Sequence, residues 1–355
     1  MVNPALNKRS ELGTEGSREP DRNIGMTDRP DKSSIAKGAH LLEVKGLKKY
    51  FPVKRGFLQR TTAWVKAVDG IDLKLARAQT LGLVGESGCG KSTVAKLILR
   101  LLVPDGGKII YNGIDIARLQ EKELKPFRRH IQIIFQDPFG SLNPRMTIGQ
   151  TIEEGLRVKG IRDRGQRKEK VAELLQMVGL SPEVASRYPH EFSGGQRQRV
   201  GIARALSVEP SLIVCDEPVS ALDVSIQAQI LNLLRDLQES FGLSYLFISH
   251  DLNVVGYMSD WVAVMYLGQI MEYAHTDSLF TQPLHPYTKA LFAAAPKLGK
   301  RATLKPLQGD VPSPINPPRG CRFQGRCPLV GNRCREMEIK LEQISDKHFV
   351  RCIRV

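Results

Sequence analysis

The middle of the chain alternates short apolar runs with segments whose apolar residues recur every three or four positions. Four runs of four or five residues read as buried strands, at 80–84, 131–135, 212–215 and 245–249. Helical faces follow two of these runs, at 94–102 and 226–237. Strands and helices that alternate in this way predict an α/β fold with a parallel sheet covered by helices.

The first part of the chain has a different pattern. Residues 1–40 carry few apolar groups and no periodicity, so they cannot offset the entropy lost on ordering, and we expect them to be disordered. Residues 41–75 predict short strands of an antiparallel sheet, interrupted by a basic loop at 52–62. Met26 is an alternative start of the protein.

Two later stretches also depart from the alternation. Residues 137–199 contain no buried-strand run, and their helical patterns near 148–158 and 168–178 indicate a helical insertion. After residue 280 prolines become dense, and the chain ends in a basic, cysteine-rich tail. We therefore expect a domain over 41–280, whose helical subdomain is 137–199, and an extension over 281–355.

Composition limits the class of protein. The 355 residues are 41% hydrophobic and 25% charged, which is typical of a globular protein with a sizeable core. No apolar run approaches the roughly 20 residues that span a bilayer, and the N-terminus has no apolar signal-peptide core. We expect a cytosolic protein without a membrane-spanning segment.

The charge is uneven along the chain. The formal net charge is +15, and residues 297–355 hold thirteen Lys and Arg against five acidic residues. A basic excess favours nucleic acid, an anionic membrane surface or a phosphorylated substrate as partner. We expect the basic tail to face anionic headgroups.

A glycine-rich segment between the first apolar run and the following helix is the strongest chemical signal. It reads Gly85, Glu86, Ser87, Gly88, Cys89, Gly90, Lys91 and Ser92. A strand before it and a helix after it are the context of a phosphate-binding loop, whose backbone N–H groups hold an anion at the helix N-terminus. Lys91 is predicted to reach the β- and γ-phosphates of ATP, and Ser92 is predicted to bind Mg²⁺. Thr93 is also predicted to bind the nucleotide. Cys89 is expected to be an inert spacer.

Polar residues end three of the predicted strands. Asp216 is predicted to hold Mg²⁺, and Glu217 to polarise an attacking water. His250 and Gln136 follow two other strands, and the carboxyl ends of parallel strands meet at one edge of a sheet. We expect His250 to sense the γ-phosphate and Gln136 to bridge the metal and the water. The predicted catalytic residues are Glu217, His250 and Gln136, and the Mg²⁺ ligands are Ser92, Gln136 and Asp216.

The segment Ser193, Gly194, Gly195 and Gln196 resembles the signature of ATP-binding cassette (ABC) ATPases, and it lies between Gln136 and Asp216 as in that family. The resemblance implies an ABC-type P-loop NTPase cassette with a parallel RecA-like sheet core, an antiparallel β subdomain and a helical subdomain. A C-terminal Pro/Cys-rich extension follows here. It also implies that two cassettes meet head to tail, so that Ser193 and the backbone of Gly195 contact the γ-phosphate bound by the partner.

Two more residues take roles from this resemblance. Residues 220–223 resemble the loop that crosses the dimer interface, which gives Asp223 a place beside the nucleotide. Tyr50 resembles the aromatic residue that stacks on adenine, and Phe51 is next to it.

Longer strings make the resemblance more specific. Segments 47–52, 136–145, 283–291 and 307–314 resemble the ATP-binding subunits of bacterial oligopeptide and dipeptide importers, and the resemblance covers essentially 41–355. It implies an ATPase motor on the cytoplasmic face of the inner membrane that drives peptide uptake. Implied partners are a second ATPase subunit or a second copy of this chain, two membrane permease subunits and, indirectly, an extracytoplasmic peptide-binding protein. Pro138 and Phe139 are expected near a permease coupling helix, and the basic tail near the permease.

Two other functions fit the sequence less well. A cassette ATPase that acts on DNA or ribosomes generally has two cassettes or a long coiled coil, whereas this chain has one of each motif and a proline-interrupted interval. We expect no nucleic-acid partner. A binding module without hydrolysis is disfavoured because Glu217 and His250 are both present. Nickel, glutathione and sugars remain alternative cargoes to peptides.

Four cysteines close the sequence: Cys321, Cys327, Cys334 and Cys352. They lack the close C-x₂₋₄-C pairs of zinc sites, and a cytosolic setting argues against disulfides. Four thiolates among arginines suit an iron–sulfur cluster, and the tail resembles that of peptide-importer ATPases, some of which carry a [4Fe–4S] cluster. Zinc and reduced structural cysteines are the alternatives. Nothing in the sequence places these cysteines near the ATP site.

Overall fold

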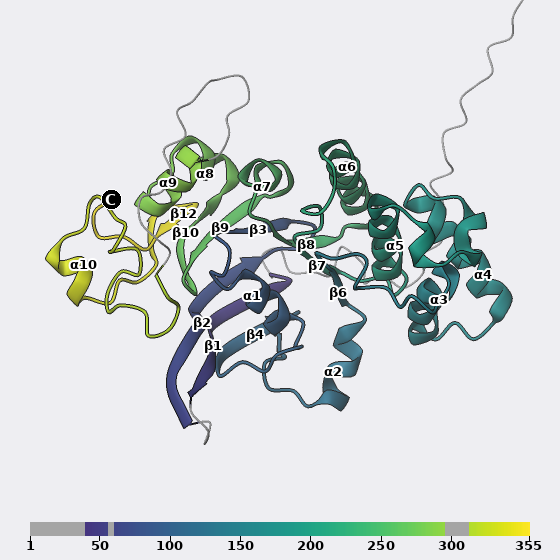
Figure 1. The fold of residues 1–355 in the computed structure, drawn as a ribbon, viewed down its shortest axis with the longest axis horizontal. Coiled ribbons are helices and arrows are strands. Elements are labelled where there is room, and N and C mark those ends of the chain that lie inside the picture. Colours follow the sequence, from purple (N-terminus) through teal and green to yellow (C-terminus); the bar gives the residue numbers. More distant parts are fainter. Residues whose placement is uncertain (1–39, 56–59, 295–311) are drawn as a thin grey trace, which may run out of the picture. The chain divides into compact units, whose positions relative to one another are not determined.

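The computed structural model describes residues 40–55, 60–294 and 312–355, all within one compact unit that begins at Gly38. The expectations for residues 1–39 and for most of the string at 307–314 lie outside the described residues. Figure 1 shows the described elements as two sheets surrounded by helices. Within these ranges, no helix combines the length and the apolar character needed to cross a bilayer.

The larger sheet contains the predicted parallel core. Among the described residues its eight strands are, in spatial order, β11 (Glu342–Ser345), β12 (His348–Val350), β10 (Gln269–His275), β9 (Trp261–Tyr266), β3 (Thr80–Val84), β8 (Ser244–Ile248), β7 (Leu212–Asp216) and β6 (Ile131–Ile134). The strands from β9 to β6 run parallel, whereas β10, β12 and β11 pair antiparallel. The parallel order brings the carboxyl ends of β3, β6, β7 and β8 to one edge.

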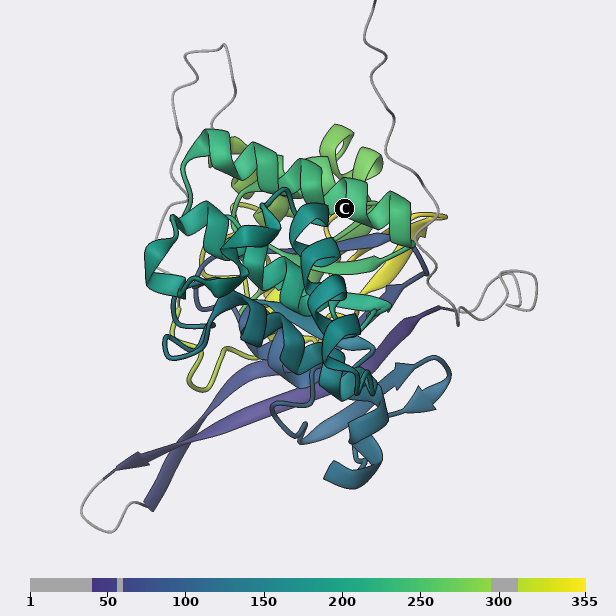
Figure 2. The ribbon, with the colours of Figure 1, turned by 90° about the vertical axis from the view of Figure 1, so that its right-hand side faces the viewer.

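The smaller sheet is antiparallel, and the two strands predicted within 41–75 are longer in the structure than expected. Its order is β2 (Arg60–Leu75), β1 (Leu42–Arg55), β4 (Gly106–Tyr111) and β5 (Ile114–Asp115). The expected basic loop at 52–62 is wrong for its described part, because Pro52 pairs with Trp64 and Lys54 with Thr61. β-Branched and aromatic residues favour strand there, and the basic side chains sit on the exposed ladder. Figure 2 shows this hairpin reaching away from the sheets.

Helices cover both faces of the larger sheet. The helices of the described residues are α1 (Lys91–Ile98), α2 (Glu121–Arg128), α3 (Ile148–Lys159), α4 (Arg164–Met177), α5 (Gly194–Leu206), α6 (Val224–Phe241), α7 (Leu252–Met258), α8 (Thr276–Thr281), α9 (Pro286–Ala294) and α10 (Asn332–Glu336), with 3₁₀ turns at Pro182–Ser186 and Pro189–Glu191. Along β7, Leu212 and Val214 pack with α1 and the smaller sheet, whereas Ile213 and Cys215 pack with α5, α6 and α7. This alternation is why strands buried on both faces read as continuous apolar runs.

The interval between β6 and β7 is helical, as its periodicity predicts. Thr147 caps α3 by accepting the N–H of Gln150, and α3 ends at Gly160, which has a left-handed φ of 101°. Asp163 caps α4 in the same way as Thr147 caps α3. Figure 1 shows α3, α4 and α5 on the opposite side of the larger sheet from α10.

The C-terminal segment is joined to the larger sheet through buried polar groups. Glu272 of β10 is fully buried, and its carboxylate accepts the N–H groups of Leu284 and His285 and pairs with His348 Nε2 at 2.6 Å. The side chains of Arg322 and Arg351 are also buried. The basic tail therefore does not simply face outward as expected, because some of its charges satisfy internal acceptors.

Candidate functional site

The loop at 85–92 connects β3 to α1, and its tight path depends on two glycines. Gly85 has a φ of 156°, and a Cβ there would lie 2.1 Å from the carbonyl oxygen of Met265. Gly90 has a left-handed φ of 112°, and its Cβ would lie 2.2 Å from the carbonyl oxygen of Ala67. Neither position has room for a side chain, so the neighbouring strands hold the loop against the N-terminus of α1.

Lys91 folds back over this loop. Its Nζ donates to the carbonyl oxygens of Gly85 at 2.7 Å and Glu86 at 3.1 Å, and the side chain is buried. A buried ammonium held by neutral carbonyls rather than by a carboxylate keeps its positive charge available to an anion. The nearby Cys89 thiol has a raised pKa because of burial, which fits the inert spacer expected from the sequence.

Ser92 and Asp216 come together beneath the loop. Ser92 Oγ donates to Asp216 Oδ1 at 3.1 Å. Burial raises the pKa of Asp216, although the Ser92 hydrogen bond acts in the opposite direction. Hydroxyl and carboxylate oxygens are ligands that suit Mg²⁺, which takes few protein ligands and completes its shell with water and phosphate. The pair therefore fits a magnesium ion bound with a nucleotide.

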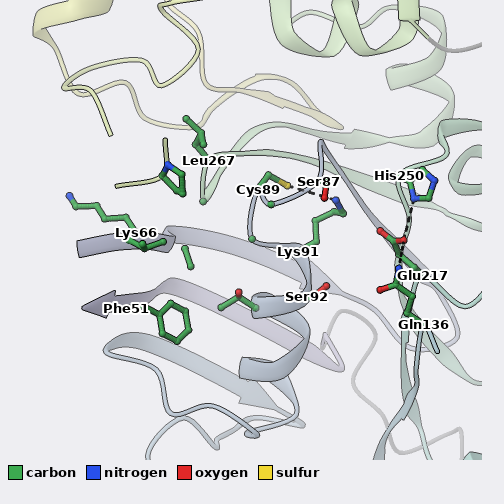
Figure 3. A pocket seen from close by; sticks show the side chains of 17 residues that line it. Phe51, Lys66, Ser87, Cys89, Lys91, Ser92, Gln136, Glu217, His250 and Leu267 are labelled. Atoms are coloured by element: carbon green, nitrogen blue, oxygen red, sulfur yellow. Dashed lines mark hydrogen bonds and ion pairs between the residues drawn. The ribbon is translucent and has the colours of Figure 1, made fainter. Parts of the chain in front are cut away.

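Three strand ends meet at Glu217. Gln136 Nε2 donates to Glu217 Oε2 at 3.1 Å, and His250 Nδ1 lies 3.2 Å from the same oxygen. Glu217 has a left-handed φ of 49°, and its N–H donates to the carbonyl oxygen of Ile248 at 3.0 Å. Figure 3 shows the Glu217 carboxylate between the other two side chains.

Lys91, Ser92, Gln136, Glu217 and His250 line one cavity of about 670 Å³, a size within the usual range for small-molecule sites. Asp216 is not one of its lining residues, and it is connected to the cavity through Ser92. Its lining residues are Phe51, Val65, Lys66, Ala67, residues 87–93, Gln136, Glu217, His250, Leu267, Gly268 and Pro314. In Figure 3 Phe51, Lys66 and Leu267 lie at one end, Glu217 and His250 at the other, and Lys91 and Ser92 between them. The cavity thus has an apolar and aromatic end and a polar end, separated by the phosphate-type loop.

Phe51, not Tyr50, lines the aromatic end of the cavity. The Tyr50 hydroxyl donates to Asp69, and its backbone N–H donates to Asp105 at 2.6 Å. Neighbouring residues of a strand point to opposite faces, so only one of the two rings can enter the cavity. Tyr50 is not among the residues that line this cavity, and its stacking on adenine stays a prediction. Strand alternation indicates that the two rings face opposite sides, and only the folded structure shows which side meets the cavity.

Several other predicted nucleotide-binding residues do not line this cavity. Ser193 Oγ caps α5 by accepting the N–H of Gln196, and Gly195 packs against Ile226. Asp223 is exposed at the start of α6. Gly194 likewise lies away from the cavity, and Gly85 and Glu86 contribute carbonyl oxygens to Lys91 instead.

The four C-terminal cysteines do not form a metal site in this geometry. Across the described ranges, no three or more His, Cys, Asp or Glu side chains are arranged to hold a metal ion. The pKa of Cys321 is raised to about 11, mainly by burial and further by the charges of the other three cysteines. The thiols therefore lie near one another without forming a ligand set, and the iron–sulfur cluster stays a prediction.

The C-terminal segment reaches the phosphate-type loop, which the sequence did not indicate. The N–H of Glu86 donates to the Tyr287 hydroxyl at 3.0 Å, and the Glu86 carboxylate pairs with Arg326 at 2.8 Å. Pro314 lines the cavity, and its carbonyl accepts the N–H of Lys66 at 3.3 Å. These contacts join residues far apart in the sequence, so no local pattern could have revealed them.

Comparisons with known proteins identify the family. Residues 68–220 match the ABC transporter family, and residues 271–334 match the family "Oligopeptide/dipeptide transporter, C-terminal region". The chain is 52% identical to the oligopeptide transport ATP-binding protein AppF of Bacillus subtilis (strain 168), covering 88% of this chain and 96% of that protein. It is 48% identical to the dipeptide transport ATP-binding protein DppF of Haemophilus influenzae (strain ATCC 51907), covering 91% and 99%.

Solved structures agree on the fold. The ATP-binding cassette MJ0796, in a dimeric post-hydrolysis state bound to ADP and Pi, is 28% identical with a TM-score of 0.58, covering 66% of this chain and 98% of that one. CbiO1 of Clostridium perfringens, from an ABC transporter complex, is 26% identical with a TM-score of 0.59, covering 68% and 91%. The cassette fold and the family expected from the sequence are confirmed. The chain belongs to the ATP-binding proteins of oligopeptide/dipeptide ABC transporters, and it is an ABC ATPase.

Proposed function

We propose that this chain is the ATP-hydrolysing motor of an ABC importer that takes up oligopeptides or dipeptides. The observation that carries the proposal is the meeting of Gln136, Glu217 and His250 beside the loop that holds Lys91 and Ser92. The names of the relatives AppF and DppF support a peptide cargo.

The phosphates of ATP would lie along the loop at 85–92. Loop N–H groups and the N-terminus of α1 would bind the phosphate oxygens, and Lys91 would leave its carbonyl partners to reach the β- and γ-phosphates. Ser92 and Asp216 would hold Mg²⁺, with Gln136 as a further ligand. When bound, the metal ion neutralises phosphate charge, and it offsets the cost of keeping the Asp216 carboxylate ionised while buried.

Glu217 is proposed as the general base. It accepts a proton from the water whose oxygen forms a bond to the γ-phosphorus, while the bond to the bridging oxygen of ADP breaks. Gln136 and His250 fix the direction of the Glu217 carboxylate through one of its oxygens. His250 would also contact the γ-phosphate.

A second cassette would complete the site. Ser193, Gly194 and Gly195 lie outside this chain's own cavity, and the cap at Ser193 presents the N-terminus of α5 to another molecule. We propose that this signature segment binds the γ-phosphate held by a partner cassette, with Asp223 at the interface. The partner is a second ATPase chain or a copy of this one.

Two permease subunits and, indirectly, an extracytoplasmic peptide-binding protein would complete the importer. Phe139, three residues after Gln136, is 57% exposed, and the guanidinium of Arg197 lies over its ring at 4.9 Å from the centroid. An exposed aromatic residue three positions after a proposed Mg²⁺ ligand supports this segment as the place where a permease helix docks. The chain would then lie on the cytoplasmic face of the inner membrane, with 281–355 as the extension specific to peptide importers.

For the C-terminal cysteines, the donor set of four neighbouring thiols supports an iron–sulfur cluster. Burial raises the pKa of Cys321, Cys327 and Cys352, and the charges of neighbouring cysteines raise it further, so bound iron would have to displace the thiol protons. Anaerobically purified protein is expected to contain iron and acid-labile sulfide. A preparation with neither contradicts the cluster, and stoichiometric zinc assigns the site to zinc.

Transport by the reconstituted complex tests the function. The complex with wild-type chain should import a labelled dipeptide or oligopeptide and hydrolyse ATP, and Lys91→Ala should abolish both because ATP binding is lost. ATP hydrolysis that responds to nickel or glutathione and not to peptides would contradict the peptide cargo and leave the motor function intact.

A further inference from the structure

Arg326 binds a carboxylate that belongs to the phosphate loop itself. Its Nη1 and Nη2 atoms donate to the two oxygens of Glu86 at 2.8 Å and 3.1 Å. The exposed fraction of the side chain is 5% for Arg326 and 20% for Glu86, so solvent screens the pair weakly. Two parallel hydrogen bonds between a guanidinium and a carboxylate fix both the charge and the orientation of Glu86.

The main chain at Glu86 is held by the same part of the protein. The N–H of Glu86 donates to the hydroxyl of Tyr287, which is fully buried in α9. Tyr287 packs against Phe323, three residues before Arg326, at 5.3 Å between ring centroids. The segment after residue 281 therefore binds both the backbone N–H and the carboxylate of Glu86.

A second arginine of the same short segment reaches the other half of the loop. Arg322 donates to the carbonyl oxygen of Leu267 and to Asp69, and its side chain is 4% exposed. The next residue, Gly268, donates its N–H to the carbonyl oxygen of Cys89 at 2.8 Å. Residues 322–326 thus contact the phosphate loop directly at Glu86. They also support it at Cys89, through the turn that contains Leu267 and Gly268.

The charge of Glu86 makes this arrangement functionally important. A carboxylate within a loop that binds phosphates has the same sign of charge as the phosphates. Where solvent is partly excluded, the repulsion between the carboxylate and a bound phosphate is substantial. The guanidinium of Arg326 offsets that charge through both carboxylate oxygens, while Lys91 Nζ donates to the Glu86 carbonyl oxygen.

We propose that Arg326 is a positioning residue for nucleotide binding: it neutralises Glu86 and, with Tyr287, holds the phosphate loop in the form that accepts ATP. The segment between Cys321 and Cys327 is then part of the nucleotide site rather than a separate tail. This inference rests on the proposed placement of the phosphates at residues 85–92.

Equilibrium binding of a fluorescent ATP analogue with Mg²⁺ to the full chain tests the proposal. Arg326→Ala should weaken binding about 10-fold, the size expected when one charge-assisted contact is lost and a carboxylate is left unpaired. The matched control is Arg333→Ala, which removes an exposed arginine of the same segment and should bind as the wild type. Glu86→Gln in the Arg326→Ala background should restore affinity to within about threefold of the wild type, because the repelling charge is gone.

The rescue separates positioning from simple stabilisation. If Arg326 only stabilises the fold, Arg326→Ala lowers the melting temperature and Glu86→Gln does not recover ATP affinity, which overturns the proposal. Should Arg326→Ala fail to fold, Arg326→Gln replaces it: this variant also leaves Glu86 without its guanidinium partner, so it must bind ATP more weakly than the wild type and regain affinity when Glu86→Gln is added, and no recovery contradicts the inference. Lys91→Ala serves as the reference. Unchanged affinity in Arg326→Ala together with lost affinity in Lys91→Ala refutes this inference alone, whereas unchanged affinity in Lys91→Ala refutes the proposed nucleotide site.

Discussion

His250 Nδ1 lies 3.2 Å from Glu217 Oε2, and Gln136 Nε2 donates to that same oxygen at 3.1 Å. The three residues follow three neighbouring parallel strands, β8, β7 and β6. A carboxylate held by side chains from both neighbours has a fixed direction, which a general base requires before any water arrives. The relationship makes Glu217 the residue on which hydrolysis should depend most.

Replacing Glu217 with Gln should separate binding from hydrolysis. The amide keeps the shape of the side chain and its contacts but cannot accept the proton of the attacking water. We expect MgATP affinity to stay near that of the wild type and turnover to fall at least about 100-fold. Phosphate release and nucleotide binding in the assembled transporter measure the two effects. Glu239→Gln, on the exposed face of α6, is the control, and wild-type turnover in Glu217→Gln would refute the assignment.

ATP hydrolysis by the purified chain should rise steeply with protein concentration. Ser193 caps α5 outside the chain's own cavity, so it is proposed to act on the nucleotide of another cassette. Specific activity is expected to be low in dilute solution and to grow as dimers form. Measuring activity and molecular mass over the same concentration series checks this, and full activity in a verified monomer would contradict a shared site.

Phe51 and Tyr50 should have different effects when changed. Phe51 lines the cavity, so Phe51→Ala is expected to weaken ATP binding about 10-fold, a typical loss for one base–aromatic stack. Tyr50→Phe removes only the hydroxyl that donates to Asp69, so it should leave ATP affinity unchanged and lower the free energy of unfolding by about 1 kcal/mol. Nucleotide titrations and chemical unfolding of both variants provide the comparison. Tyr50→Ala removes the ring itself, and a larger affinity loss in Tyr50→Ala than in Phe51→Ala would identify Tyr50 as the residue that stacks on adenine.

Acid should destabilise the protein through His285. Burial lowers the pKa of His285 to about 4, despite the nearby Glu272 charge, and its Nδ1 accepts the N–H of Tyr287. An unfolded chain takes up this proton near pH 6.5 while the folded chain does not, so the free energy of unfolding falls as pH is lowered from about 6.5 towards 4. This one group accounts for up to about 3 kcal/mol of that fall.

Urea unfolding at pH 7 and pH 5 measures this dependence. His285→Asn retains a side-chain acceptor but takes up no proton, so the difference in unfolding free energy between the two pH values should shrink. His190→Asn is a control, because it removes a histidine whose side chain is exposed. An equal loss of stability in His285→Asn and in the wild type would rule out His285 as the cause.

Local sequence was sufficient for the parts of the site that are contiguous in the chain. The loop at 85–92 was recognisable because glycines, Lys91 and Ser92 must occur at fixed spacing between a strand and a helix to hold a phosphate. Asp216, Glu217, His250 and Gln136 were found because each follows an apolar run, and parallel strands end at one edge. Apolar periodicity also predicted α3 and α4, whose caps are formed by residues within a few positions of each helix end.

Tertiary structure decided the contacts between distant segments. The pairing of Arg326 with Glu86 joins residues 240 positions apart, and the choice of Phe51 over Tyr50 depended on which face of β1 meets the cavity. Spacing rules describe neighbours along the chain, because helix and strand periodicity come from local backbone geometry. Long-range ion pairs and the walls of a cavity arise only when separate elements pack together, so they could be read only from the folded molecule.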